Sequence, residues 1–474
     1  MHRKHKASAL PLRDENAGRT HGALVTQLPH DEALRERRFR ALYAQPPDFR
    51  DLARRDPDFA ATVKGRELDF RDPHAVMQLT KTLLKLDFGI KISLPNNRLC
   101  PPDLLDTSTY DQPGQKLTGL DIGTGASCIY PLLGCAQRPW SFIATDVDAE
   151  SLRWARQNVE QNDLTSRVKL LLRTPEDALI PAAELSESAS VAFTMTNPPF
   201  YESEAALLLS ASRKQRPPHT ACTGSAAEMV TAGGELAFVR RILHESVPLG
   251  PRIQWYTAMF GFLSSVTAFV DSLRQRGVGN YAVTEFLQGT KTRRWAVAWS
   301  FAAMRPAQAV ARGTRSAPSS NILPPVTEME FAAADGCAEH VGAFSAAVVA
   351  AIGALDLLSW EWQREACEGV GRAPGRVWAR AWRRRKRQQQ QQQQQEALVA
   401  GAESDKCEFG FRVWIRVSVS RAVLVGCRWM EGFDAAAFES FQGFLKALAK
   451  DAAAAGAAAA HGPSSSPADR LQAP

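Results

Sequence analysis

Closely spaced cysteines are missing from this chain of 474 residues. Its eight cysteines never form a Cys-x-x-Cys pair or a cluster with histidine. Scattered thiols are typical of buried residues in a reducing compartment, whereas disulfide frameworks and zinc sites need closely spaced cysteines. The sequence therefore predicts neither a disulfide-stabilised secreted domain nor a metal site.

Long apolar segments are missing as well. No apolar stretch follows Met1–Lys6, and the most apolar run, Ser345–Leu355, is too short to cross a bilayer. We therefore expect an intracellular protein with no signal peptide and no contact with a membrane.

One segment lacks acidic residues altogether. Between Gly371 and Arg387 there are seven arginines, one lysine and no Asp or Glu, a local charge of +8 in a chain whose net charge is +7. The rest of the chain is therefore nearly neutral, and a basic surplus held in one segment is typical of nucleic-acid binding or nuclear targeting. Within it, Arg383–Arg387 is a candidate RNA contact or nuclear localisation signal. We expect a nuclear protein, and a cytoplasmic population is also compatible with the sequence.

Length and composition predict a globular protein of more than one domain. Hydrophobic residues make up 45% of the chain and charged residues 23%, which are ordinary globular values. Shifts in composition divide the chain into a flexible basic arm at 1–45, an α/β domain at 46–302, a Pro/Ala/Ser-rich linker at 303–325, a smaller α+β domain at 326–450 with a low-complexity insertion at 371–405, and a disordered tail at 451–474.

Short apolar runs alternate with helical ones in the first of these domains, which predicts a mostly parallel α/β sheet. The expected strands are Leu117–Ile122, Phe142–Thr145, Val168–Leu172 and Val191–Thr196, with a helix over Ala149–Gln161 and an antiparallel edge formed by Ala282–Leu287 and Trp295–Phe301. In the second domain, strands over Phe411–Ser418 and Ala422–Cys427 and a helix over Ala435–Lys450 indicate a small α+β module.

A glycine-rich turn follows the first expected strand, at Asp121–Ser127. Gly123 and Gly125 let the backbone turn tightly and approach a ligand closely. The third glycine of a dinucleotide-binding fingerprint is replaced by Cys128, which favours a ligand without phosphates.

An acidic residue, Asp146, ends the next expected strand. A carboxylate at this position can accept hydrogen bonds from both hydroxyls of a ribose. Alternatively, Asp146 caps the helix that begins near Ala149. The order of glycine turn and strand-end acid favours the nucleoside site.

The sequence Asn-Pro-Pro-Phe at Asn197–Phe200 closes the fourth expected strand. Asn-Pro and Pro-Pro also occur in ordinary turns. The motif also suits the methylation of an exocyclic amine. The Asn197 side-chain oxygen and the Pro198 carbonyl can each accept one N–H of the amine and so localise its nitrogen lone pair. Pro199 stiffens the turn, and Phe200 can stack on a base that has left its helix. Such a reaction depends on alignment and electrostatics and needs no metal.

Several longer motifs closely resemble the methyltransferase-like-sixteen family. They are Gly119–Gly134, Asn158–Asn162, Asn197–Phe200, Gly233–Ile242 and Thr284–Phe301. The resemblance covers Pro46 to Phe301 and implies a Rossmann-like class I methyltransferase domain that uses S-adenosylmethionine. It implies methylation of an adenosine at N6, with U6 small nuclear RNA as the substrate, and an RNA-binding role for the C-terminal α+β domain.

The resemblance also implies the residues of the site. Catalysis is assigned to Asn197, Pro198, Pro199 and Phe200, and cofactor binding to Gly123, Thr124, Gly125, Ser127, Asp146, Asp177 and Asn197. One family feature is missing, an Arg-x-Asn-Tyr stretch whose arginine contacts the cofactor, since Arg98–Pro102 runs directly into Asp103. Either this chain has lost a cofactor contact or the sequence comes from an incomplete gene model, and we favour the second explanation because the motifs around the gap are intact.

Two basic clusters are candidate RNA contacts. Ser212–Pro218 is basic and stiffened by proline, and Lys291–Trp295 combines basic residues with an aromatic ring, a combination that suits phosphate contacts and base stacking. A solvated loop is the alternative for each cluster. The candidate residues are Arg213, Lys214, Arg216, Lys291, Arg293 and Arg294.

Three other functions fit parts of this pattern. A protein glutamine methyltransferase uses the same motif on an amide, but the basic loops and the second domain argue against it. A ribosomal-RNA base methyltransferase, acting on guanine N2 or adenine N6, differs only in base-edge contacts. An RNA-binding factor with an inactive methyltransferase fold is the third alternative, which the missing arginine supports. The sequence does not indicate an oligomeric state.

Overall fold

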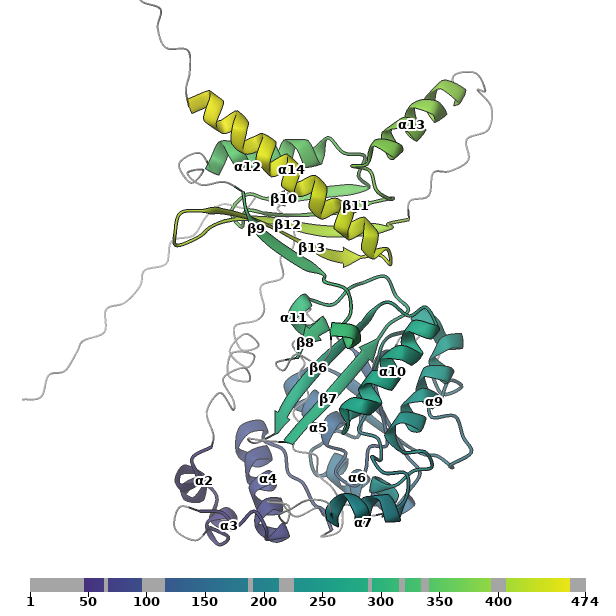
Figure 1. Ribbon diagram of the computed structural model, residues 1–474. Helices are drawn as coiled ribbons and strands as arrows, with labels where there is room; N and C mark the ends of the chain where they lie inside the picture. The colour runs from purple at the N-terminus through teal and green to yellow at the C-terminus, as the bar shows by residue number, and fades with distance from the viewer. Residues whose placement is uncertain are drawn as a thin grey trace, which may run out of the picture. The chain divides into compact units, whose positions relative to one another are not determined.

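The computed structural model describes residues 47–63, 67–95, 116–185, 191–212, 226–288, 292–314, 320–333, 341–393 and 406–460 (Figure 1). The expected arm at 1–45, the gap after Arg98 and most of the basic segment Ser212–Pro218 lie outside the described residues. Among the helices that are described, none combines the length and the apolar character that a membrane span requires.

Three helices precede the first sheet. They are α2 (Phe49–Arg55), α3 (Pro57–Ala60) and α4 (Pro73–Phe88). Asp56 is buried between α2 and α3, where it accepts hydrogen bonds from Thr82 and Lys85 of α4. These bonds hold the pKa of Asp56 below its usual value even though burial acts in the opposite direction. A buried carboxylate with two donors thus fixes α4 against the shorter helices.

The first sheet has eight strands in the order β3-β2-β1-β4-β5-β7-β6-β8. The neighbouring strands from β3 to β5 in this order are all parallel to one another, and β7 pairs antiparallel with both β5 and β6. In chain order the strands are β1 (Thr118–Ile122), β2 (Ser141–Asp146), β3 (Val168–Leu172), β4 (Val191–Thr196), β5 (Ile253–Phe260), β6 (Tyr281–Gln288), β7 (Thr292–Trp299) and β8 (Arg312–Gly313).

Helices cover both faces of this sheet. The apolar residues of α9 (Gly234–Leu249) and α10 (Leu263–Gln275) pack with Leu120 and Ile122 of β1 in one core. Those of α4, α5 (Ile129–Gln137) and α6 (Ala149–Glu160) pack with Phe142 and Ala144 of β2 in another. This is the three-layer arrangement of a Rossmann-like methyltransferase domain, and it confirms the predicted fold class. Short helices α7 (Glu204–Ser212) and α8 (Ala226–Met229) follow β4.

The region expected to be a linker is partly regular. It contains α11 (Gln308–Ala311), β8 and a 3-10 turn at Ser320–Ile322, and β8 pairs with β6 at the edge of the first sheet. The Pro/Ala/Ser-rich linker expected over 303–325 therefore contains short regular elements, which composition alone did not indicate. Proline and alanine content misled the prediction, because a two-residue edge strand has no detectable periodicity.

A second sheet of five antiparallel strands has the order β10-β11-β12-β13-β9. Its strands are β9 (Glu328–Ala332), β10 (Ser359–Gln363), β11 (Glu368–Ala373), β12 (Phe409–Val417) and β13 (Val423–Glu431). Helices α12 (Val341–Gly353) and α14 (Ala435–Ala460) bury one face of the sheet through Phe411 and Phe441, whose ring centroids are 4.5 Å apart. The opposite face carries Arg412 and Trp414, which are only partly buried. The α+β class of this module is confirmed.

Two details of the second module differ from the prediction. Gly371–Ala373 belong to β11, and Arg380–Gln393 form helix α13, so the segment 371–405 is not a low-complexity insertion throughout. The Phe411 ring occupies the space that a side chain at position 371 would need, so only glycine fits there. A strand with glycine at such a position lacks the alternating apolar residues from which strands are predicted. Helix α14 runs to Ala460, well into the expected tail, since alanine is a strong helix former.

Candidate functional site

Three strand ends meet at one edge of the first sheet. The register pairs Ile122 of β1 with Thr145 of β2 on one side and with Thr196 of β4 on the other. The residues that follow these strand ends are Gly123, Asp146 and Asn197. Strands β2 and β3 lie on one side of β1, and β4 and β5 lie on the other, so the direction of chain progression across the sheet reverses between β1 and β4. Open α/β sheets bind ligands at such a switch point.

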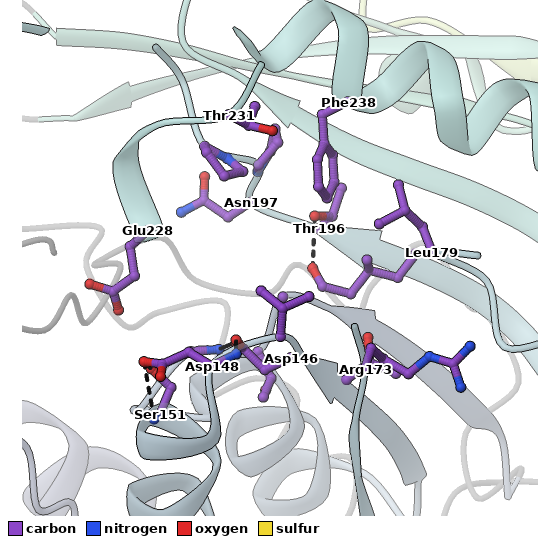
Figure 2. A pocket seen from close by; sticks show the side chains of 18 of the residues that line it. Asp146, Asp148, Ser151, Arg173, Leu179, Thr196, Asn197, Glu228, Thr231 and Phe238 are labelled. Carbon is purple, nitrogen blue, oxygen red and sulfur yellow. Dashed lines mark hydrogen bonds between the residues drawn. The ribbon is translucent and has the colours of Figure 1, made fainter. Parts of the chain in front are cut away.

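A cavity of about 260 Å³ opens at this edge (Figure 2). All ten residues predicted for catalysis and cofactor binding line it, namely Gly123, Thr124, Gly125, Ser127, Asp146, Asp177, Asn197, Pro198, Pro199 and Phe200. The structure thus brings both halves of the predicted site into one cavity, although the chain separates them by about 70 residues.

The glycine turn is shaped for close approach of a ligand. Gly123 and Gly125 have φ of 76° and 63°, in the left-handed region that favours glycine. A Cβ on Gly123 would meet no atom within 4 Å, so the backbone there faces open space. The Gly125 N–H donates to Asp146 Oδ2 at 2.8 Å, which ties the turn to the end of β2.

Asp146 does not cap the following helix. The N-cap of α6 is Asp148, whose carboxylate accepts from the N–H groups of Glu150 and Ser151. Burial raises the pKa of Asp146, and the N–H groups of Asp148 and Gly125 partly offset that effect. Because each carboxylate oxygen has a second lone pair, Asp146 keeps acceptor capacity toward the cavity.

Asn158 supports the glycine turn from behind. Its side chain is fully buried on α6, donates to Ala126 O and Ser93 O at 3.0 Å, and accepts from Ser93 N at 2.7 Å. The Asn158–Asn162 motif therefore fixes the backbone of the turn and the segment after α4, and does not itself face the cavity.

Asp121 makes the turn electrostatically negative. Its side chain is fully buried, and the Thr124 hydroxyl is the neighbouring group that favours its ionised form. Burial raises its pKa to about 7, and the negative charge of Asp146 adds to that shift. Two buried carboxylates beside an open glycine turn favour a cationic ligand. S-adenosylmethionine fits this requirement, since it carries a sulfonium and an ammonium group beside a ribose.

The far wall of the cavity is the loop after β3. Asp177 accepts from the Thr174 N–H at 2.7 Å, which lowers its pKa. Helix α9 anchors the same loop through Glu245, whose carboxylate accepts from the N–H groups of Leu179 and Ile180 at 3.1 and 2.8 Å. Ala178 and Leu179 also line the cavity and offer an apolar surface to a flat ring such as adenine.

The Asn-Pro-Pro-Phe turn supplies a free acceptor. Asn197 Oδ1 is buried and has no hydrogen-bond partner among the described residues. Figure 2 shows Asn197 on the opposite side of the cavity from Asp146 and Asp148, with Phe238 of α9 beside Thr196. A donor on a bound substrate, such as an exocyclic N–H, would satisfy this oxygen.

Phe200 is packed on more than one side. A Cβ on Gly261 would lie 2.9 Å from Cδ1 of the Phe200 ring, so the ring edge occupies the space left by the missing side chain. The guanidinium carbon of Arg294 lies 5.1 Å from the ring centroid, over its face. Of the predicted RNA contacts, Arg294 is thus next to the catalytic turn.

The other predicted RNA contacts are placed differently. Arg293 forms an ion pair with Glu285 of the neighbouring strand β6. Arg213, Lys214, Arg216 and Lys291 lie outside the described residues.

Sequence reasoning missed several residues of the cavity wall. Phe238 and Arg241 reach it from α9, Arg173 from the loop after β3, and Glu228 from α8. Phe238 and Arg241 are three residues apart, which places them on one face of the helix, and both belong to the Gly233–Ile242 motif. That spacing is the signal that could have identified them.

Comparisons with known proteins agree with this geometry. Residues 33–303 match a family described as RNA methyltransferase. The chain is 35% identical over 402 residues to the U6 small nuclear RNA (adenine-(43)-N(6))-methyltransferase of Schizosaccharomyces pombe, covering 82% of this chain and 97% of that protein. It is 42% identical over 277 residues to the human RNA N(6)-adenosine-methyltransferase METTL16, covering 54% of this chain and 49% of that protein. It therefore spans about half the length of the human relative.

A solved structure shows the same fold. The hMettl16 catalytic domain in complex with the MAT2A 3′UTR hairpin 1 superposes with a TM-score of 0.50 at 41% sequence identity. The similarity covers 54% of this chain and 92% of that chain.

Proposed function

The chain belongs to the RNA methyltransferase family, and from that premise we propose that it transfers a methyl group from S-adenosylmethionine to N6 of an adenosine in U6 small nuclear RNA. One observation supports the reaction type most directly: Asn197–Phe200 lie next to the glycine turn, at the switch point of the sheet. The similarity to the fission-yeast enzyme supports the choice of RNA, because it extends over both modules of the chain.

The residues of the cavity perform this reaction by alignment. The cofactor supplies an activated methyl group on a sulfonium, which the carboxylates of Asp121 and Asp146 favour electrostatically. Asn197 Oδ1 and the Pro198 carbonyl accept the two N–H groups of the adenine amine, so that its lone pair is directed along the reaction path. Phe200 stacks on the base, and the amine loses a proton once the methyl has moved. Fixed acceptors in a desolvated site need no reorganisation at that moment.

We also propose that RNA phosphates contact the basic side chains around the catalytic turn. Arg294 already lies over Phe200, and Arg293 is half exposed at the same strand. The predicted contacts Arg213, Lys214, Arg216 and Lys291 flank this region in the sequence. Basic residues around an aromatic ring suit a strand whose base has been turned out of its helix.

The second module is proposed to be an accessory RNA-binding domain. Its open sheet face carries arginines that are mostly paired with glutamates, such as Arg412 with Glu368 and Arg428 with Glu328. In α13, by contrast, Arg383, Arg384 and Arg385 are exposed, and no ion pair is found for them in the described residues. The helix is held by Trp382 and Lys386, which both donate to Asp356. We therefore expect RNA to contact α13 rather than the sheet.

The same arginines support a nuclear location. A compact cluster of basic residues on an exposed helix is accessible to an import receptor. Replacing Arg383, Arg384, Arg385 and Arg387 by glutamine in a fluorescent fusion should reduce nuclear accumulation. If RNA binding is their role, the same variant should flatten the slope of log affinity against log salt concentration. Unchanged localisation together with an unchanged slope would mean that the cluster is a solvated surface with neither of these roles.

Methyl transfer from labelled cofactor to total RNA and to total protein tests the function, followed by identification of the modified nucleoside. We expect N6-methyladenosine in RNA, and a U6 transcript should compete as substrate with unrelated RNA of equal length. Label in protein alone would favour a glutamine methyltransferase, and N2-methylguanosine would favour a guanine methyltransferase. Cofactor binding without transfer would indicate an inactive fold.

A further inference from the structure

Glu235 is a buried acid next to the catalytic turn that the mechanism above does not use. It is 2% exposed at the start of α9, directly after Gly233 and Gly234. Its carboxylate accepts from the Gly261 N–H at 2.6 Å and from the Phe262 N–H at 3.1 Å. Burial raises its pKa, whereas these N–H groups and the nearby charge of Arg294 favour the ionised form.

These bonds fix the turn against which Phe200 packs. Gly261 directly follows β5 and precedes Phe262, the N-cap of α10, and a Cβ on Gly261 would collide with the Phe200 ring edge at 2.9 Å. Gly234 also lies close to Phe200, since a Cβ on it would be 3.3 Å from the Phe200 carbonyl oxygen. Both close backbone approaches to Phe200 therefore involve Glu235 or its immediate neighbour.

We propose that Glu235 is a positioning residue for Phe200, acting through the Gly261–Phe262 turn. The carboxylate holds two consecutive backbone N–H groups and so sets the distance between α9 and the start of α10. That distance determines how far the Phe200 ring reaches into the cavity. The inference rests on the proposed function, in which Phe200 stacks on the target adenine.

Helix α9 carries a second carboxylate that provides a matched control. Glu245 also accepts from two consecutive backbone N–H groups, those of Leu179 and Ile180, but on the cofactor side of the cavity. The two acids thus hold backbone N–H groups from the same helix in different parts of the site, and Glu245 additionally pairs with Arg241 of the cavity wall. A general loosening of α9 would affect both halves, whereas separate positioning roles would not.

The test uses the full chain with 4-fluorophenylalanine at position 200 in addition to the unlabelled protein. Glu235→Gln keeps the size of the side chain but replaces one acceptor by an NH2 group that faces a backbone donor. We expect the fluorine resonance to shift or broaden, and kcat on an unmethylated U6 transcript to fall by about 100-fold, the effect expected for a displacement near 1 Å. The Kd for S-adenosylmethionine should stay within about twofold of wild type.

Gly261→Ala crowds the same ring directly while keeping the Glu235 carboxylate, whose Oε2 would lie 3.3 Å from the new Cβ, and it should reproduce both the spectral change and the loss of kcat. Glu245→Gln should leave the fluorine resonance unchanged while weakening cofactor binding by about tenfold. A Glu235→Gln protein with the wild-type resonance and wild-type kcat would overturn the proposal, as would an equal loss of cofactor binding in the Glu235 and Glu245 variants. If the wild-type protein transfers no methyl to RNA, the proposed function fails, while the fluorine spectra still decide whether Glu235 positions Phe200.

Discussion

Thr196 Oγ1 donates a hydrogen bond of 2.8 Å to the Ile122 carbonyl, and this bond joins the last residue before the catalytic turn to the last residue before the glycine turn. Both residues are buried, and their strands are direct neighbours in the sheet. The bond therefore sets the spacing between the methyl donor and its acceptor at the point where the two turns begin.

Thr196→Val should lower kcat more than it lowers stability. The substitution keeps the side-chain shape but removes one hydrogen bond, at a cost of about 1 kcal/mol in the free energy of unfolding. A matched control is Thr194→Val on the same strand, where Oγ1 accepts a hydrogen bond from the Thr257 N–H of β5. Denaturant unfolding measures the stability of the two variants, and single-turnover kinetics measures their rates. We expect a loss of rate for Thr196→Val alone. Equal rates would mean that the strand ladder sets the spacing without this bond.

Asn197→Ala should abolish methyl transfer while the fold remains intact. The residue follows β4 and its side-chain oxygen bonds to no described atom, so the substitution removes an acceptor for the substrate rather than a structural contact. Transfer from labelled cofactor measures the rate, and thermal unfolding checks the fold. A variant with a near-normal rate would contradict the proposed mechanism.

Phe200→Ala should weaken productive placement of the base. Loss of one stacking ring costs about 1–3 kcal/mol in kcat/KM. Phe433→Ala is the control, because that residue is 60% exposed and does not line the cavity. Its effect should stay within about 0.5 kcal/mol, as for ordinary surface substitutions. Similar losses in the two variants would mean that the RNA uses both rings.

Because of Asp121, the stability of the protein should fall as pH rises, whereas its affinity for the cofactor should increase. Its pKa is raised by burial to about 7, well above the value of an unfolded aspartate, so the unfolded chain loses this proton first and stability falls as pH rises from about 4 to 7. The cost above pH 7 is on the order of 4 kcal/mol. Asp121→Asn should therefore raise the melting temperature of the cofactor-free protein at pH 8 but not at pH 4.

The ionised form should attract the cofactor, so the affinity of the wild-type protein for S-adenosylmethionine should increase through pH 7. Calorimetry with S-adenosylhomocysteine provides the control, because that product lacks the sulfonium charge and should respond less to pH and to Asp121→Asn. Identical pH profiles for the two ligands would show that Asp121 does not act through charge on the sulfonium.

The strands of the first sheet could be predicted because each is a short apolar run between turn signals. The expected ranges Val168–Leu172 and Val191–Thr196 agree with β3 and β4 at both ends. In the second module, β10 and β11 were missed because Trp360 and Trp362 alternate with polar residues only briefly and Gly369 and Gly371 remove the apolar pattern. There the large rings of one strand fill the space of glycines on the next, a pairing that only tertiary structure reveals.

Most residues that line the cavity could be predicted because they follow strand ends in short motifs, whereas Asp177 came only from the family resemblance. The residues that hold them could not, since their partners are far away in the sequence. Glu235 bonds to residues 26 and 27 positions later, and Asn158 bonds to Ser93, 65 positions earlier. A buried acid after two glycines is a visible feature, but nothing local indicates which backbone it holds.

Helix α13 also bears on the glutamine tract that begins at Gln388. Among the described side chains, Lys386 is the last in this helix with a hydrogen bond to a residue outside it. Each glutamine inserted into or removed from this helix would change its length by about 1.5 Å beyond that anchor. Chains that differ in glutamine number should therefore keep the same core and the same site.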